Sequence, residues 1–255
     1  MARKRFFIMH KEMEHEDHFV VRVWNVYRRI NPLFHIFPTG DVLKMRKIFL
    51  FKKYSKEIFR SNCNKALDLG SGKYLSLPRE VYPPNFEIYA LDLFPPKDYP
   101  FSVKASAIKI PFRSNSFGLV VASELIEHVE SPEELIKEII RVLAPDGVAV
   151  ITTPWLHDIF TQPERYILSP LVGRALKKDG ILRRILKPIV DYWVKSKERG
   201  ELHISWHSCF YWRKLFSKYF SSVVEVGILP KPFRFSRNSI INFLFGSSMF
   251  YICKK

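Results

Sequence analysis

The central part of the chain alternates short apolar runs with helical stretches, and this alternation limits the fold more than any other feature. Apolar runs that predict strands lie at residues 65–69, 86–91, 102–105, 117–122 and 148–152. Near-continuous apolar runs are typical of strands in a parallel sheet, because crossover helices cover both of its faces. We therefore predict an α/β fold with a Rossmann-like, mostly parallel sheet.

Helix and turn signals fit between these runs. Ser131-Pro132-Glu133-Glu134 has the pattern of a capping box with proline at the first helical position, so a helix is expected to follow it. Ala144 to Gly147 predicts a turn into the next strand. The C-terminal part predicts a helix at 208–220, a strand at 222–228, a short helix and a last strand at 248–253. The sheet should then have seven strands, including an antiparallel edge strand.

With 255 residues the chain is long enough for one large α/β domain with its own core. We divide it into an N-terminal helical segment, residues 1–64, and a domain at residues 65–255. The N-terminal segment has helical patterns at 19–30 and from an N-cap at Asp41 to about Phe59. A basic, apolar insertion at 156–202 has a helical apolar face that is expected to form a lid, although the same face can equally pack on the core.

Composition narrows the class of protein without choosing its partner. Hydrophobic residues make up 47% of the chain and charged residues 26%, as in soluble globular proteins. The formal charge of +16 attracts nucleic acid, a phospholipid surface or a phosphorylated metabolite, although a solvated basic surface explains it equally well. The three cysteines match no metal or redox spacing, and no signal peptide or membrane span is visible. We expect a cytoplasmic protein without a metal site.

Ala66 to Gly72 places two glycines directly after a strand, where the backbone must turn sharply and approach a ligand closely. A glycine-rich turn is a weak signal by itself. Asp92 strengthens it, because this residue ends the next apolar run, about twenty residues beyond the glycines. A carboxylate at that position can accept hydrogen bonds from both ribose hydroxyls of an adenosine.

These motifs continue into a longer resemblance. Over residues 65–153 the sequence resembles the class I S-adenosylmethionine-dependent methyltransferases of the broad type 11 group. Ala107 to Val129 resembles the third and fourth motif region of that family, and Ser131 to Gly147 resembles its next helix and turn. The resemblance implies a methyltransferase that uses S-adenosylmethionine as its cofactor.

Carried over by position, the resemblance implies a cofactor site. Asp68, Gly70, Ser71 and Gly72 would surround the methionine part, Asp92 would hold the ribose, and Leu93, Ser106, Ala107 and Ser123 would complete the site. The chain departs from the family at three positions. Ser106 stands where an acidic residue is frequent, Tyr74 where a third glycine is common, and Gly118 where an Asp is common. Prolines at 78, 83 and 84 should also shorten the helix after the loop.

Methyl transfer depends on positioning and on exclusion of water, so no general base is obligatory. If the acceptor carries a proton, His128, His203 or His207 can remove it, because imidazole titrates near neutral pH. Each of these histidines can equally be structural.

Three functions remain open. Val23 to Leu33 and Thr39-Gly40-Asp41 resemble the N-terminal region of ubiquinone and menaquinone C-methyltransferases, and a basic amphipathic helix at 156–202 can cover an apolar substrate or contact a membrane surface. We therefore expect a small-molecule or lipid-like, quinone-type acceptor. An RNA acceptor comes second: Gly72 to Leu75 resembles transfer-RNA wobble-uridine methyltransferases, and the positive charge suits RNA. The third function is a methyltransferase-like binding protein without catalysis.

Overall fold

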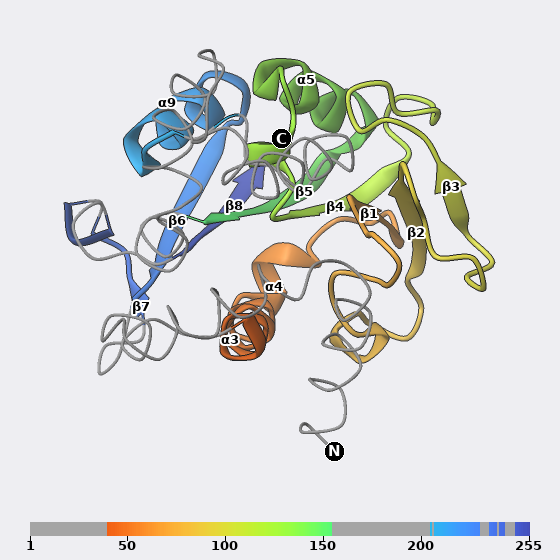
Figure 1. The fold of residues 1–255 in the computed structure, drawn as a ribbon, viewed down its shortest axis with the longest axis horizontal. Coiled ribbons are helices and arrows are strands. Elements are labelled where there is room, and N and C mark those ends of the chain that lie inside the picture. Colours follow the sequence, from red (N-terminus) through yellow and green to blue (C-terminus); the bar gives the residue numbers. More distant parts are fainter. Residues whose placement is uncertain (1–39, 155–204, 206, 230–234, 239, 243–247) are drawn as a thin grey trace, which may run out of the picture. The chain divides into compact units, whose positions relative to one another are not determined.

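A computed structural model describes residues 40–154, 205, 207–229, 235–238, 240–242 and 248–255, all within one compact unit (Figure 1). The predicted helix at 19–30, the insertion at 156–202 and His203 lie outside the described residues. The elements, in chain order, are α3 (Gly40–Lys53), α4 (Ser55–Ile58), β1 (Lys65–Leu69), η2 (Arg79–Val81), β2 (Glu87–Asp92), β3 (Ser102–Lys104), β4 (Phe117–Ser123), η3 (Ile126–His128), α5 (Pro132–Val142), β5 (Leu143–Pro154), α9 (Cys209–Tyr219), β6 (Ser222–Ile228), β7 (Phe235–Ser236) and β8 (Ser248–Lys254).

These strands form one sheet in the order β3-β2-β1-β4-β5-β8-β6-β7. Strands β3, β2, β1, β4 and β5 pair in parallel, whereas β8 is antiparallel to both β5 and β6. The edge strand β7 is antiparallel to β6. The predicted fold class is confirmed, although the described sheet has eight strands rather than seven. The additional strand is β7, whose two residues are too few to produce a periodic signal.

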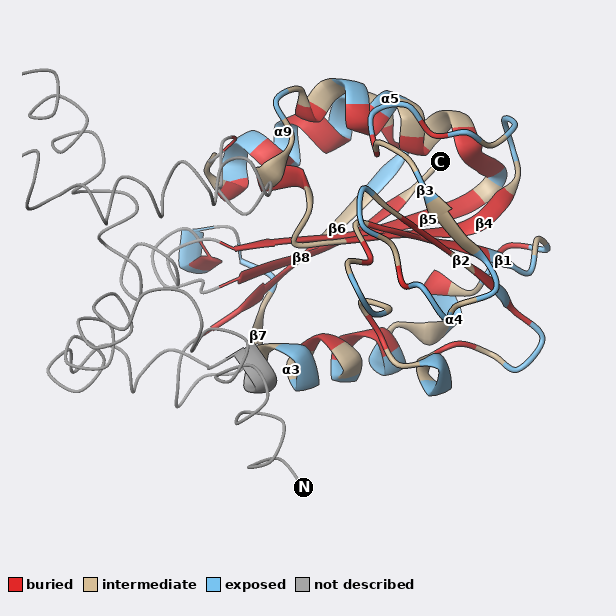
Figure 2. Ribbon diagram, turned by 45° about the vertical axis from the view of Figure 1, so that its right-hand side comes forward, coloured by how far each residue is buried: buried red, intermediate tan, exposed pale blue. Residues whose placement is uncertain are grey.

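Helices cover both faces of the sheet, α5 and α9 on one side and α3 and α4 on the other (Figure 2). Alternate residues of the strands face the two layers. Leu67 and Val120 pack in the core under α5 and α9, and their neighbours Ala66 and Leu119 pack with α3 and α4. The strands are therefore apolar on both faces, which explains the near-continuous runs in the sequence. In the part of the chain that the structure describes, no helix is long and apolar enough to cross a membrane.

Three details of the predicted boundaries were wrong. The helix expected from the N-cap Asp41 to Phe59 begins at Gly40 and is interrupted at Tyr54, between α3 and α4. Ser131 forms no capping box. Its hydroxyl makes no cap hydrogen bond, although its carbonyl accepts from Leu135 N, the usual first hydrogen bond of a helix. Pro132, at the first turn, has a fixed φ that starts the helix without this cap.

The predicted turn at Ala144 to Gly147 is an irregularity within a longer strand. Pairing between β4 and β5 shifts from Phe117–Leu143 to Leu119–Val148 at this point. Asp146 accepts hydrogen bonds from Ser61 Oγ and Asn62 N, which attach the irregular segment to the chain before β1. A turn signal in the sequence therefore marks a local departure from the ladder rather than the start of a strand.

Candidate functional site

The candidate site lies where the strand order reverses. Strand β1 has β2 on one side and β4 on the other, and the three strands run in parallel. Ligands of open α/β sheets bind outside the carboxyl ends of the strands at such a point. Gly70, Asp92 and Ser123 all lie at this edge, because Gly70 follows β1 and the other two residues end β2 and β4. The structure brings these three predicted positions together.

Both glycines of the loop after β1 have a left-handed backbone, with φ of +70° at Gly70 and +62° at Gly72. Their surroundings differ. A Cβ at Gly70 would lie 2.8 Å from Leu125 Cδ1, whereas a Cβ at Gly72 would meet nothing within 4 Å. Gly70 thus allows close packing against the turn after β4, and Gly72 leaves open space beside its backbone.

Asp92 connects the loop after β1 to the loop after β2. Its Oδ2 accepts from Gly72 N at 2.9 Å, and its Oδ1 accepts from Phe94 N at 2.7 Å. Each carboxylate oxygen has a second lone pair, so the half-buried Asp92 can still accept from ligand hydroxyls. Leu93 and Phe94 follow it with exposed side chains. A polar acceptor therefore stands beside two apolar surfaces.

Asp68 lies below this edge and is fully buried. Its carboxylate accepts from Ser76 N and Ser76 Oγ, each at 2.7 Å, and burial raises its pKa to about 7. The side chain therefore contacts the far end of the loop. Ser71 and Ala107 are also buried, and Ser106 is half-buried in a turn that Lys109 N closes onto its carbonyl.

The departures from the family pattern have structural explanations. A Cβ at Gly118 would lie 2.0 Å from the carbonyl oxygen of Cys63, so the segment before β1 excludes any side chain there. Tyr74 is 81% exposed, and its ring does not fill the loop. The helix after the loop is reduced to the three residues of η2, as the prolines predicted.

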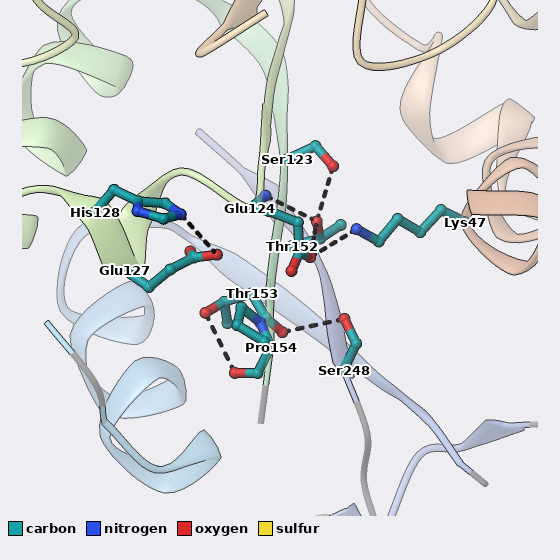
Figure 3. Close-up of polar contacts among 9 residues, drawn as sticks. All are labelled: Lys47, Ser123, Glu124, Glu127, His128, Thr152, Thr153, Pro154 and Ser248. Carbon is teal, nitrogen blue, oxygen red and sulfur yellow. Dashed lines mark hydrogen bonds and ion pairs between the residues drawn. The ribbon is translucent and has the colours of Figure 1, made fainter. Parts of the chain in front are cut away.

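A second polar cluster occupies the ends of β4 and β5 (Figure 3). Glu124 has φ of +54°, and its Oε1 accepts from Lys47 Nζ at 2.7 Å and from Thr152 Oγ1 at 2.8 Å. Glu124 N donates to the Thr152 carbonyl, and the Ser123 hydroxyl lies 3.1 Å from Thr152 Oγ1. Sequence reasoning named Ser123 but missed its partners, because Lys47 lies on α3, 77 residues before Glu124, with no local pattern joining them.

Two of the candidate histidines, His128 and His207, lie within the described residues. His128 ends η3, with its Nε2 4.0 Å from Glu127 Oε1. His207 stacks on Tyr211 with 3.8 Å between ring centroids, and burial lowers its pKa below the usual value for histidine. Ser205 N donates to the Glu127 carbonyl and Ser205 Oγ to that of Val129, so the segment leading to His207 is bonded to the one carrying His128.

Comparison with known proteins gives consistent results. Residues 67–151 match the model of a methyltransferase domain family. The chain is 36% identical to norajmaline N-methyltransferase of Rauvolfia serpentina over 28% of its length, covering 24% of that enzyme. It is 34% identical to a methyltransferase of Mycolicibacterium vanbaalenii over 35% of each protein. The chain thus matches about a quarter to a third of the length of these curated relatives.

Among solved structures, an S-adenosylmethionine-dependent methyltransferase from Archaeoglobus fulgidus has a similar fold. The TM-score is 0.51 at 15% sequence identity, covering 94% of this chain and all of the other. At this identity the likeness supports the architecture described above.

Proposed function

We propose that this chain, whose residues 67–151 match a methyltransferase domain family, transfers a methyl group from S-adenosylmethionine to a small or lipid-like acceptor. The observation that carries the proposal is the meeting of Gly70, Gly72 and Asp92 at the switch point of the sheet. All three residues fall within the segment that the family model matches.

The residues present fit S-adenosylmethionine. The open space beside Gly72 admits the methionine part close to the backbone, and Asp92 keeps lone pairs for the ribose hydroxyls. Exposed Leu93 supplies apolar surface for the adenine ring, next to Ser106 and Ala107 in the following turn. Ser123 lies at the end of β4 with its hydroxyl toward Thr152. Asp68 and Ser71 are buried, and Asp68 holds the loop through the hydrogen bonds that it accepts from Ser76.

Bound S-adenosylmethionine supplies an electrophilic methyl group. The protein contributes position and a dry environment, because charge disperses during this transfer. Glu124 presents a carboxylate at the end of β4 that can orient a hydrogen-bond donor of the acceptor. His207 can take a proton near neutral pH, because burial lowers its pKa and keeps the imidazole neutral. His128, at the same edge, is the alternative base.

The acceptor class rests on sequence outside the described residues. The 156–202 segment combines apolar positions with lysines and arginines and follows β5, whose carboxyl end lies at the site. An apolar, quinone-type acceptor, with contact to a membrane surface, suits this composition. An RNA acceptor is the second candidate, favoured by the net charge of +16.

Cofactor binding is tested by calorimetry with S-adenosylhomocysteine. We expect the wild type to bind and Asp92→Ala to bind about ten- to a hundredfold more weakly, since a hydrogen bond to a charged group contributes about 1.5–3 kcal/mol. Asp98→Ala is the matched control, because Asp98 is an exposed aspartate in the loop that follows β2. Absence of wild-type binding, or equal binding by Asp92→Ala, contradicts the proposal.

The acceptor is tested by radiolabelled methyl transfer to fractionated lipid, RNA and small-molecule pools. Ile185→Ser with Leu186→Ser should abolish transfer to an apolar acceptor with little dependence on salt. An RNA acceptor instead requires Arg183 and Arg184, and its methylation falls steeply from about 50 to 200 mM salt. Binding of S-adenosylhomocysteine without labelled product in any pool supports the non-catalytic alternative.

A further inference from the structure

The loop after β1 lacks the element that normally fixes it. In Rossmann-like sheets the glycine loop leads directly into a helix, whose first N–H groups face the ligand. Here residues 70–78 contain no helix, and the three-residue η2 begins only at Arg79. Other contacts must therefore hold Gly70 and Gly72 in their left-handed conformations.

Asp68 and Ser76 close the loop at its base. Asp68 is the fourth residue of β1, and its carboxylate accepts from both the amide and the hydroxyl of Ser76, each at 2.7 Å. Hydrogen bonds to an ionised acceptor are roughly twice as strong as neutral ones. Because Asp68 is fully buried, water does not compete for these bonds.

The chain beyond Ser76 is fixed separately. The Arg79 guanidinium donates to four main-chain carbonyls at 2.8–3.3 Å, those of Tyr82, Pro83, Pro84 and Phe86. The loop thus runs between two anchored segments, β1 and the Arg79 turn. Its middle contacts the proposed ribose-binding residue, since Gly72 N donates to Asp92. We therefore expect a displacement of Ser76 to shift Gly72 and its contact with Asp92.

We propose that Ser76 is a positioning residue for the cofactor, which replaces the missing helix by holding the loop on the ionised carboxylate of Asp68. This inference rests on the proposed function, because it takes S-adenosylmethionine to be the ligand of the loop. Ser76 acts through the loop backbone and the Gly72–Asp92 contact, with no contact of its own to the reacting atoms.

The two hydrogen bonds from Ser76 to the Asp68 carboxylate, called here the Asp68–Ser76 tie, depend on pH. Burial raises the pKa of Asp68 to about 7, opposed by its hydrogen bonds from Ser76. Asp92 on β2 raises this pKa further and Lys44 on α3 lowers it, while Tyr82, Tyr99 and Arg79 also lie within electrostatic reach on the same side. As the pH falls through about 7, the carboxylate gains a proton and loses its charge-assisted bonds. Cofactor binding should weaken over that range.

The experiment measures S-adenosylhomocysteine binding by calorimetry at pH 8 and pH 6. We expect Ser76→Ala to weaken binding about ten- to a hundredfold at pH 8, as loss of one charge-assisted hydrogen bond implies, and Ser76→Thr to restore it. Ser116→Ala is the matched control, because Ser116 Oγ also bonds a single acceptor but lies at the opposite end of β4. Asp68→Asn should remove the difference between the two pH values.

Amide hydrogen exchange of residues 70–76 in the free protein separates the two proposals. Faster exchange in Ser76→Ala than in Ser116→Ala supports the tie even if no cofactor binds, and then only the proposed function is wrong. Wild-type-like binding and exchange in a folded Ser76→Ala protein overturn the inference. Thermal melting identifies a variant that does not fold, in which case Ser76→Thr against Ser76→Val carries the same comparison.

Discussion

Two turns at the carboxyl edge of the sheet reach a left-handed backbone by different means. The turn after β1 uses glycine at positions 70 and 72, whereas the turn after β4 uses Glu124. The first is tied through Asp68 to a residue eight positions away, and the second through Glu124 to Lys47, 77 positions away. Leu125 packs against Gly70, so the two turns are in contact.

The conformation of the first turn is determined by residues close to it in the sequence, and that of the second turn by residues far from it in the sequence. A glycine adopts positive φ without strain, so contacts such as Asp68–Ser76 need only order the turn after β1 and offset no backbone strain. A glutamate there costs about 1–3 kcal/mol and persists only when its surroundings over-determine it. Thr152 and Lys47 supply those surroundings through bonds to both the main chain and the side chain of Glu124. The turn after β1, where we propose that the cofactor binds, is thus encoded by nearby residues, whereas the turn after β4, which we propose faces the acceptor, requires the folded sheet and α3.

The largest expected effect comes from substituting Gly70, where the two turns are in contact. Gly70→Ala should lower the free energy of unfolding by about 2–4 kcal/mol, because backbone strain adds to the collision with Leu125. Gly72→Ala has the same strain without the collision and should lose only about 1–2 kcal/mol. Urea denaturation measures both. Equal losses, or no recovery when Gly70→Ala is combined with Leu125→Ala, would show that the turns are independent.

The turn after β4 is tested by removing its distant partner. Lys47→Met keeps the side-chain length but leaves Glu124 without its ion pair, and should lower the free energy of unfolding by about 1–3 kcal/mol. The side chain of Glu124 is 33% exposed, so the lower part of that range is expected. Lys218→Met is the matched control. The ion pair between Lys218 and Glu133 is also 2.7 Å long but largely exposed, so this substitution should change the melting temperature little. Similar effects would falsify the special role of Lys47.

The smallest change in the free energy of unfolding is expected for a substitution of Tyr82, which follows η2 after the first turn. Within the described residues, the Tyr82 hydroxyl is buried and has no hydrogen-bond partner. Tyr82→Phe removes this hydroxyl and should change the free energy of unfolding by less than about 1 kcal/mol, toward greater stability. Equilibrium denaturation in urea resolves the sign. A clear loss of stability, together with weaker S-adenosylhomocysteine binding, would mean that Tyr82 assists the Asp68–Ser76 tie.

The same division explains what the sequence could predict. The strands and the register that places Asp92 at the end of β2 follow from local apolar periodicity and glycine spacing. The sequence could show that Gly118 departs from the family pattern but not why, because the carbonyl of Cys63, which excludes a side chain there, approaches only through tertiary packing. The prediction of a capping box at Ser131 was wrong because several local features can start a helix, and here Pro132 at the first helical position does so. The Lys47–Glu124 pair left no sequence signal.

The buried carboxyl group of Asp68 also couples folding to proton uptake. Its pKa rises from 3.8 in the unfolded chain to about 7 in the folded protein, so the folded protein retains a proton that the unfolded chain has released. The resulting stabilisation, on the order of 4 kcal/mol, is fully present below about pH 4 and disappears as the pH rises through about 7. Cofactor binding to the ionised form has the opposite proton linkage. Near neutral pH, ligand binding would therefore expel a proton from the protein interior, and the observed heat of binding would vary with the ionisation enthalpy of the buffer.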